Sequence, residues 1–244
     1  MAKKRLDVLA QERYPQYSRT QIQSWIMQGK VFVDAKVITK AGNQIKEDAV
    51  IELRAQEPKF VGRAGFKIEH ALDHFNLDVN NYIVLDAGIS TGGFTDCLLQ
   101  RGAKKIFGVD VGYGQVAEKI RRDDRVVMLE RTNLRHLKSS DLGQKVDLIT
   151  LDLSFISLLK VMDAIVDILK NDGKLITLIK PQFEAGKKDV GRGGVITSPD
   201  VHKKVIKHVV DGIEHYGFSC KGVIESPILG ATGNKEFLAY FERV

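Results

Sequence analysis

The chain has 244 residues, of which 43% are hydrophobic and 28% are charged, and its formal net charge is +6. This length fits one domain of ordinary size plus a small module, and the composition excludes a low-complexity chain or one with a run of apolar residues long enough to cross a membrane. Two cysteines, Cys97 and Cys220, are too few for a disulfide framework or a zinc site, so we expect a cytoplasmic protein with no metal. Because no apolar run is long enough to span a membrane, we also expect no membrane partner.

The positive charge is concentrated at the front of the chain. Up to Gly62 there are 11 Lys and Arg against 7 Asp and Glu. A basic region of this kind indicates a polyanionic partner such as nucleic acid, although many solvated protein surfaces have a similar charge.

Two short helices and two strands are predicted for this front module. Apolar residues recur at helical spacing over residues 6–10, and Ser18 forms a capping-box pattern with Gln21 at the start of a second helix. Apolar runs at residues 31–37 and 49–53 predict a strand with a tight turn and a later strand.

This order of elements resembles the S4 RNA-binding domain over residues 3 to about 54. The resemblance lies in Arg-Leu-Asp at 5–7, Ser-Arg-Thr-Gln-Ile-Gln at 18–23, Gly-Lys-Val-Phe-Val-Asp at 29–34 and Asp-Ala-Val-Ile-Glu-Leu at 48–53. It implies that a basic face contacts structured RNA through Lys4, Arg5, Arg19, Gln21 and Lys30. The alternative is a small cap that packs on the main domain. We expect an S4-like domain at residues 1–56 and a polar linker at 57–62.

From Arg63 onward, helical patterns alternate with apolar strands. The predicted strands are 82–86, 105–110, 126–129, 146–152, 174–179, 223–225 and 237–241. Helices are expected at 66–75, 158–169 and from 199 to about 216. This alternation predicts an α/β domain at residues 63–244 with a doubly wound parallel sheet.

The stretch from Asp86 to Phe94 joins an apolar strand to an apolar helix through a glycine loop. Such a loop lets a nucleotide-like ligand approach the helix N-terminus. Its spacing differs from Gly-x-Gly-x-x-Gly, which disfavours a nicotinamide dehydrogenase. The carboxylate of Asp86 suits a cationic or hydroxyl-bearing ligand better than a pyrophosphate. S-adenosylmethionine fits this description, and an ordinary tight turn is the alternative.

Charged residues follow the predicted strands, at the edge where ligands bind in doubly wound sheets. They are Asp86, Asp110, Glu130, Asp152 and Lys180. Asp110 stands where a carboxylate would bind ribose hydroxyls. Asp152 and Lys180 end neighbouring strands and could meet beside the reactive end of the cofactor, or be solvated loop charges. If they meet, Lys180 could act as a base or a positioning group for methyl transfer to a hydroxyl.

Six motifs in this order resemble the TlyA (haemolysin A) family, in which an S4 domain is fused to an FtsJ-like ribose methyltransferase with a Rossmann-like class I methyltransferase sheet. They lie at residues 63–67, 86–96, 108–112, 151–157, 179–184 and 233–237. The resemblance implies S-adenosylmethionine-dependent 2′-O-methylation of cytidine in ribosomal RNA, by a catalytic tetrad of Lys67, Asp152, Lys180 and Glu236. It implies cofactor contacts from Asp86, Gly88, Ser90, Thr91, Gly92, Gly93, Phe94, Asp110, Glu130, Asn133 and Asp152.

Further RNA contacts are expected from Arg63 and from Lys187, Lys188 and Arg192 in a basic loop, which could instead be a disordered surface loop. Ile89 departs from the family, where a small residue is usual. We expect ribosomal RNA or ribosomal subunits as partners and favour a monomer. The alternatives are a ribosome-binding assembly factor with a vestigial methyltransferase site and, less favoured, a membrane-active haemolysin.

Overall fold

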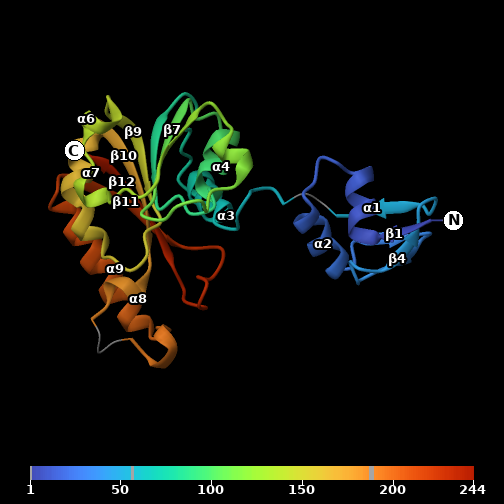
Figure 1. Ribbon diagram of the computed structural model, residues 1–244. Coiled ribbons are helices and arrows are strands. Elements are labelled where there is room, and N and C mark those ends of the chain that lie inside the picture. Colours follow the sequence, from blue (N-terminus) through green and yellow to red (C-terminus); the bar gives the residue numbers. More distant parts are fainter. Residues whose placement is uncertain (1, 56–57, 187–189) are drawn as a thin grey trace. The chain divides into compact units, whose positions relative to one another are not determined.

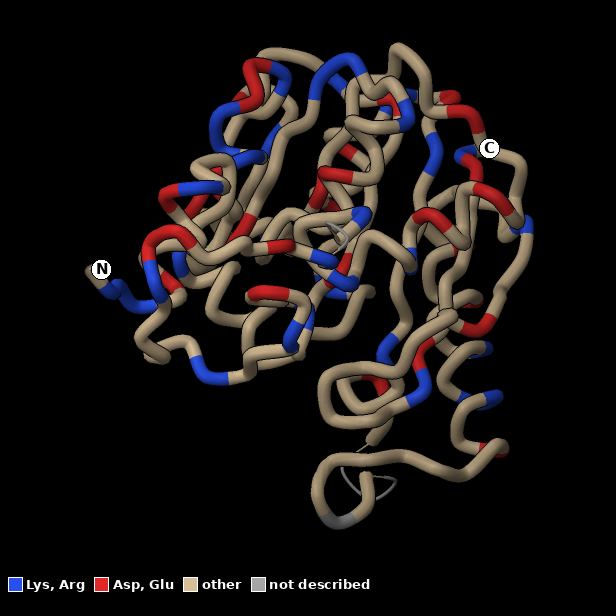
Figure 2. Tube along the Cα trace, turned by 90° about the vertical axis from the view of Figure 1, so that its right-hand side faces the viewer, with Lys and Arg blue, Asp and Glu red and all other residues tan. Residues whose placement is uncertain are grey.

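The computed structural model describes residues 2–55, 58–186 and 190–244, and it divides into two compact units, Met1–Lys59 and Phe60–Val244 (Figure 1). Lys187 and Lys188 of the expected basic loop lie outside the described residues. Lys and Arg are interleaved with Asp and Glu along the chain trace (Figure 2).

The first unit is a small α+β structure. Its elements are β1 (Lys3–Arg5), α1 (Leu6–Arg13), α2 (Arg19–Met27), β2 (Val31–Val33), β3 (Lys36–Val37), β4 (Gln44–Lys46) and β5 (Ile51–Leu53). As the capping pattern predicts, Ser18 Oγ accepts a hydrogen bond from the backbone N–H of Gln21 at 3.2 Å. The tight turn between β2 and β3 has positive φ at Asp34 and Ala35. The short antiparallel pair of β1 and β4 was not predicted.

The apolar faces of α1 and α2 pack with β2 and β5 to form the core of this unit. Its buried residues are Leu6, Leu9, Ala10, Ile22, Trp25, Ile26, Val31, Val33, Ala49 and Ile51. The helical spacing of these apolar residues therefore serves to close one small core.

The second unit is built on a seven-stranded sheet. Its strands are β6 (Ile83–Ala87), β7 (Lys105–Val109), β8 (Val126–Leu129), β9 (Val146–Leu151), β10 (Leu169–Ile179), β11 (Phe218–Glu225) and β12 (Phe237–Arg243). Its helices are α3 (Gly65–His74), α4 (Gly93–Gln100), α5 (Glu118–Arg121), α6 (Ser139–Leu142), α7 (Met162–Ile168), α8 (Pro181–Glu184) and α9 (Pro199–Glu214), with short 3₁₀ turns η1 (Leu134–His136), η2 (Leu158–Val161) and η3 (Arg192–Gly194).

The strands lie in the order β11-β12-β10-β9-β6-β7-β8. The chain runs outward from β6 to β8 and then returns to β9 on the other side of β6, so the strand order reverses between β6 and β9. A reversal of this kind is where doubly wound sheets bind ligands, outside the carboxyl ends of the strands. The expected α/β fold is confirmed.

Two details of the predicted second domain were wrong, the direction of one strand and the extent of one helix. The sheet is mixed, because β12 runs antiparallel to both β10 and β11. In addition, the segment predicted as one helix at 158–169 is η2 followed by α7, and Leu169 already belongs to β10. The apolar pattern of the last strand, Phe237 to Phe241, reads the same in both directions and therefore cannot give its orientation.

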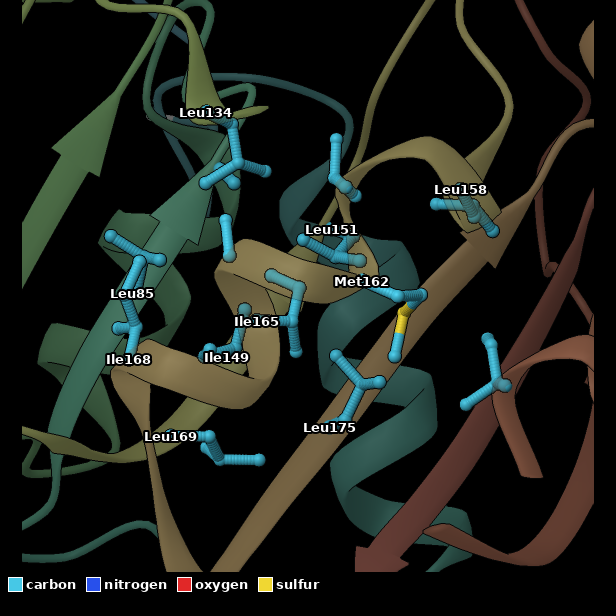
Figure 3. Close-up of a cluster of buried hydrophobic side chains, with 14 of the residues drawn as sticks. Leu85, Leu134, Ile149, Leu151, Leu158, Met162, Ile165, Ile168, Leu169 and Leu175 are labelled. Atoms are coloured by element: carbon cyan, nitrogen blue, oxygen red, sulfur yellow. The ribbon is translucent and has the colours of Figure 1, made fainter. Parts of the chain in front are cut away.

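Helices cover both faces of the sheet, with α3 and α4 against one face and α7 and α9 against the other (Figure 1). On the second face, Met162, Ile165 and Ile168 of α7 pack over Leu151 and Leu175 (Figure 3). Burial on both faces explains why the central strands are nearly continuous apolar runs.

The segment before α3 packs with the second unit. Phe60 is buried, with 3% of its surface exposed, and the backbone N–H of Val61 donates to Asp96 Oδ2 in α4 at 2.8 Å. This segment includes residues that the sequence placed in the linker.

Candidate active site

The carboxyl edge of the sheet gathers most of the residues expected in a catalytic site. Gly88, Asp110, Asp152 and Lys180 each follow the last residue of a parallel strand. Glu236 precedes β12, and because β12 runs antiparallel, its first residues lie at the same edge. Residues far apart in the sequence are thus brought to one side of the sheet.

The glycine loop approaches the end of β9 very closely. Gly88 has φ +84°, and a Cβ built on it would lie 2.4 Å from the carbonyl oxygen of Asp152. Gly92, at φ +95°, is the residue that precedes α4. Because a side chain would collide at the first position and both backbones are left-handed, glycine is required at this turn.

Asp86 is completely buried beneath the loop. Its two carboxylate oxygens accept hydrogen bonds from the hydroxyls of Thr95 at 2.6 Å and Thr150 at 2.9 Å. Burial raises the pKa of Asp86 to about 6, although both hydroxyls oppose the change. Asp86 therefore joins β6 to α4 and β9 from within the core.

A cavity of about 380 Å³ opens outside the ends of β6, β7 and β9; we call it the first cavity. Five of the expected cofactor residues line it: Gly88, Ser90, Asp110, Asn133 and Asp152. The carboxylate of Asp110 accepts hydrogen bonds from the backbone N–H groups of Ser90 at 2.9 Å and Gly112 at 2.8 Å, which fixes its orientation. The volume lies in the usual range for small-molecule sites.

The other expected cofactor residues are not among those that line the first cavity. They are Asp86, Thr91, Gly92, Gly93, Phe94 and Glu130. Phe94 is buried in the core, and Glu130 pairs with Arg121 at 2.7 Å and accepts a hydrogen bond from Gly114 N–H. The hydrogen bond from Arg121 lowers the pKa of Glu130.

Two nearly inaccessible ion pairs contain all four residues of the expected tetrad. Lys67 Nζ lies 2.5 Å from Glu236 Oε2, and Lys180 Nζ lies 2.6 Å from Asp152 Oδ1. The exposed fractions of these side chains are 6% and 3% in the first pair and 10% and 16% in the second. Burying two ion pairs requires well-placed partners, because desolvation opposes it.

A second cavity of about 330 Å³ lies beside the first, and Lys180 and Glu236 both line it. Ser154 and Phe155 line both cavities, so the two meet there. Ser154 Oγ accepts a hydrogen bond from Lys180 Nζ at 2.9 Å. Lys180 and Asp152 are thus placed at the junction of the two cavities.

Phe155 was missed by the sequence reasoning. Its side chain is 89% exposed, its φ is +64°, and its ring lies 5.0 Å from that of Phe183. A positive φ is unusual for a bulky residue. The one available signal in the sequence was that Phe155 lies in the motif that begins at Leu151. Phe155 stands three residues after Asp152 in that motif.

The segment that carries Glu236 is fixed by a glycine and an asparagine. A Cβ on Gly230 would lie 2.4 Å from Glu236 Oε1, so the carboxylate fits only because position 230 has no side chain. Asn234 is fully buried. Its side-chain amide donates a hydrogen bond to Gly194 O and accepts one from Ile196 N–H, both at 2.9 Å. These bonds join the segment to η3 and to the residues that follow η3.

Comparisons with known proteins agree with this geometry. Residues 60–243 match the model for FtsJ-like methyltransferases, and residues 4–51 match the model for the S4 domain. The chain is 41% identical over 224 residues to the 16S/23S rRNA (cytidine-2′-O)-methyltransferase TlyA of Mycobacterium tuberculosis, covering 91% of this chain and 84% of that one. The chain belongs to the TlyA family.

Other relatives carry a different name. Hemolysin A of Brachyspira hyodysenteriae is 42% identical over 225 residues, covering 92% of this chain and 93% of the relative. A solved structure from Streptococcus thermophilus, with the provisional name hemolysin, is 40% identical, has a TM-score of 0.76 and covers 100% of this chain and 90% of that one. In this TlyA-family chain, none of the described helices is both long and apolar enough to cross a bilayer.

In the first unit, which contains the S4 match, the residues expected to bind RNA differ from one another in their surroundings. Lys4 pairs with Glu12 at 3.1 Å and Glu47 at 3.4 Å, while Arg5 and Arg19 both pair with Asp7. Gln21 lines an open groove on α2, and Lys30 is exposed. In the second unit, Arg63 is exposed and Arg192 begins η3.

Proposed function

We propose that this protein is an S-adenosylmethionine-dependent methyltransferase that methylates the 2′-hydroxyl of cytidine in ribosomal RNA. The observation that carries the proposal is the junction of the two cavities at Ser154 and Phe155, with the Lys180–Asp152 pair beside it. One cavity suits a small cofactor, the other can receive an acceptor, and the charged groups lie where the two meet. The Mycobacterium tuberculosis relative, a 16S/23S rRNA (cytidine-2′-O)-methyltransferase, supports the same reaction.

The residues of the first cavity fit the cofactor. Asp110 presents a carboxylate oriented by two backbone N–H groups, which suits ribose hydroxyls, and Asn133 offers an amide further along the cavity. A Cβ on Gly88 would block the close approach of the loop to Asp152. When bound there, S-adenosylmethionine supplies a methyl group from its sulfonium centre to the acceptor oxygen.

In the second cavity, the proposed role of Lys180 is to hold the ribose hydroxyl and to receive its proton as the new bond to oxygen forms. Asp152 and Ser154 hold the amine of Lys180 from two sides, at 2.6 Å and 2.9 Å. Glu236, held by Lys67, lines the same cavity, and the proposed role of this pair is to help position the hydroxyl for attack. Positioning of this kind supplies much of the acceleration in transfer reactions.

The target nucleotide has to leave its base stack to reach a cavity beside the sheet. Phe155, which lines both cavities, offers an exposed aromatic ring, and unstacked RNA bases commonly stack on such rings. The S4 unit would hold the surrounding RNA through Lys4, Arg5, Arg19, Gln21 and Lys30. Arg63, Lys187, Lys188 and Arg192 are proposed as further phosphate contacts. The proposal includes ribosomal subunits as partners, a monomer and a cytoplasmic site of action.

The test is transfer of a labelled methyl group to ribosomal RNA by Lys180→Ala. We expect the rate to fall by about 10²–10⁴-fold, the usual contribution of a group that transfers a proton. Binding of S-adenosylmethionine, measured by calorimetry, should be retained.

The matched control is Lys170→Ala, because Lys170 pairs with Asp147 at 2.5 Å and joins the same two strands, β9 and β10, at their other end. Its side chain is 41% exposed, and we expect a rate within about twofold of wild type. Equal rates for Lys180→Ala and wild type would remove Lys180 from the mechanism. Cofactor binding without transfer to any RNA would favour an assembly factor.

A further inference from the structure

Asp7 is an unusual residue for the surface module of an RNA-binding protein. It is the second residue of α1, yet none of its surface is exposed. Buried carboxylates are found where they are paired. The partners of Asp7 are two residues already proposed to contact RNA, and this arrangement carries an inference that rests on the proposed function.

Both guanidinium groups converge on this one carboxylate. Arg5, at the end of β1, donates from Nε to Oδ1 at 3.0 Å and from Nη2 to Oδ2 at 3.1 Å. Arg19, at the start of α2, donates from Nε to Oδ2 at 3.0 Å, and its Nη2 lies 2.9 Å from the same oxygen.

Uncharged donors complete the surroundings of Asp7. Gln23, one turn further along α2, donates to Oδ2 at 2.6 Å, and Val8 N–H donates to Oδ1 at 3.1 Å. Burial alone would raise the pKa of Asp7, but the hydrogen bonds from Arg5, Gln23 and Arg19 outweigh it and hold the pKa well below its ordinary value. Asp7 is thus an anion whose oxygens are all occupied by donors.

The two arginines, in contrast, remain open to solvent. The exposed fractions of their side chains are 48% for Arg5 and 46% for Arg19. A guanidinium has five N–H donors in a rigid fork, so each arginine keeps donors beyond those that reach Asp7. Gly42 lies next to Arg5, since a Cβ built on Gly42 would be 3.6 Å from Arg5 Nη1. Because glycine has no side chain, position 42 does not cover the guanidinium group of Arg5.

The cluster of two arginines and one aspartate therefore has a net charge of +1 and holds two forks beside each other at the surface. Unsupported arginine side chains lose rotamer freedom when they bind, and groups that are already ordered avoid that loss. Paired guanidinium forks match the oxygens of a phosphate.

We propose that Asp7 is a positioning residue that holds Arg5 and Arg19 as one preformed clamp for a backbone phosphate of RNA. Asp7 does not touch the RNA. It acts by fixing the two arginines, and the clamp fixes the position of the RNA without reading its sequence.

The test is the affinity of the full-length protein for purified ribosomal RNA, measured over a series of salt concentrations. Asp7→Asn removes a negative charge, so a simple change of net charge would tighten binding. The proposal predicts the opposite result. Binding should weaken by roughly tenfold, because Asp7 is in contact with the two arginines that bind the RNA and its effect on affinity is coupled to theirs. The slope of log affinity against log salt should fall in magnitude by about one, since one phosphate contact is lost.

Glu52→Gln is the matched control. Glu52 is an exposed acid of the same unit that pairs with Arg54, which is not among the proposed RNA contacts, so this variant removes the same charge without touching the clamp. We expect unchanged or slightly tighter binding. The fluorescence of Trp25, the one tryptophan in the sequence, shows whether the unit remains folded, because this side chain is buried in its core.

A second variant keeps the test valid if Asp7→Asn fails to fold. Arg5→Lys keeps the positive charge but loses the fork that Asp7 orients, and it should also weaken binding. In a background where Arg5 and Arg19 are both alanine, Asp7→Asn should change affinity by less than about twofold, because its effect passes through them.

Wild-type or tighter binding by Asp7→Asn, together with unchanged binding by Arg5→Lys, would overturn the clamp while leaving the proposed function intact. If the wild-type protein itself fails to bind ribosomal RNA, the proposed function fails and not only the clamp.

Discussion

Among the described residues, Asp7 in the first unit and Asp86 in the second are aspartates with none of their surface exposed, and the two have opposite surroundings. Asp7 in the first unit is held by two guanidinium groups, an amide and a backbone N–H, whereas Asp86 in the second unit has uncharged donors, the hydroxyls of Thr95 and Thr150 and the backbone of Thr95. The pKa of Asp7 is lowered and that of Asp86 is raised to about 6. The same residue type thus orders cations at a surface in one unit and joins elements within a core in the other.

The difference shows that burial alone does not determine how a carboxylate behaves. Desolvation raises the pKa of both side chains; the hydrogen bonds from Arg5, Gln23 and Arg19 outweigh it at Asp7, whereas those from the two threonines do not outweigh it at Asp86. The two units can be followed separately, because Trp25 reports on the first unit and far-UV circular dichroism is dominated by the larger second one.

The largest effect is expected from Thr150→Val. This change removes one of the donors to the buried carboxylate of Asp86 and should lower the free energy of unfolding of the second unit by about 2–4 kcal/mol at pH 7. The cost should be smaller at pH 5, where Asp86 is protonated in the folded protein. Urea unfolding followed by circular dichroism measures both values.

Thr177→Val is the control for this prediction. Thr177 is equally buried on the neighbouring strand β10, and its hydroxyl finds no hydrogen-bond partner among the described residues. We expect this variant to be neutral or slightly stabilising. Equal costs for the two valine variants would show that the Thr150 hydroxyl does not stabilise Asp86.

The second prediction concerns the pH dependence of the second unit. The folded pKa of Asp86, about 6, exceeds the unfolded value of 3.8, so the folded state binds the proton more tightly. Stability from this group is therefore fully present below pH 3.8 and is lost as the pH rises toward 6, by on the order of 2–3 kcal/mol. The stability of wild type relative to Asp86→Asn should fall over this range, and a difference that is constant with pH would contradict the assignment.

The smallest effect, of opposite sign, is expected for Asp7→Asn. Because the folded pKa of Asp7 is depressed, its contribution is present above the unfolded value and is lost as the pH falls below it. The arginines are half exposed, so solvent screening limits the effect to roughly 1 kcal/mol. Unfolding followed by Trp25 fluorescence should show wild type losing its advantage over the variant as the pH falls from 5 to 3. An advantage that grows on acidification would refute this interpretation.

The sequence predicted the elements whose signals are local. The apolar runs of the central strands are unambiguous because both faces of the sheet are covered, and the cap at Ser18 lies beside the helix that it starts. Other features depend on distant parts of the chain. The direction of β12 is set by its neighbours, and β1 and β4 are three-residue strands that exist only because they pair.

The candidate site divides in the same way. Asp110, Asp152 and Lys180 could be found because they directly follow strands. Glu236 resembles a solvated charge before a strand, and its burial depends on Lys67, which is 169 positions away in the sequence. The glycine loop likewise pointed to Asp86 as a cofactor group, whereas its threonine partners, Thr95 and Thr150, come from α4 and β9.

The most direct test of the central claim is to locate the methyl group that the protein transfers. Ribosomal RNA is incubated with wild-type protein and labelled S-adenosylmethionine, digested to nucleosides and examined by mass spectrometry. The proposed function predicts label on the ribose oxygen of cytidine, as 2′-O-methylcytidine. Label on a nucleobase, or none in RNA although the cofactor binds, would contradict it.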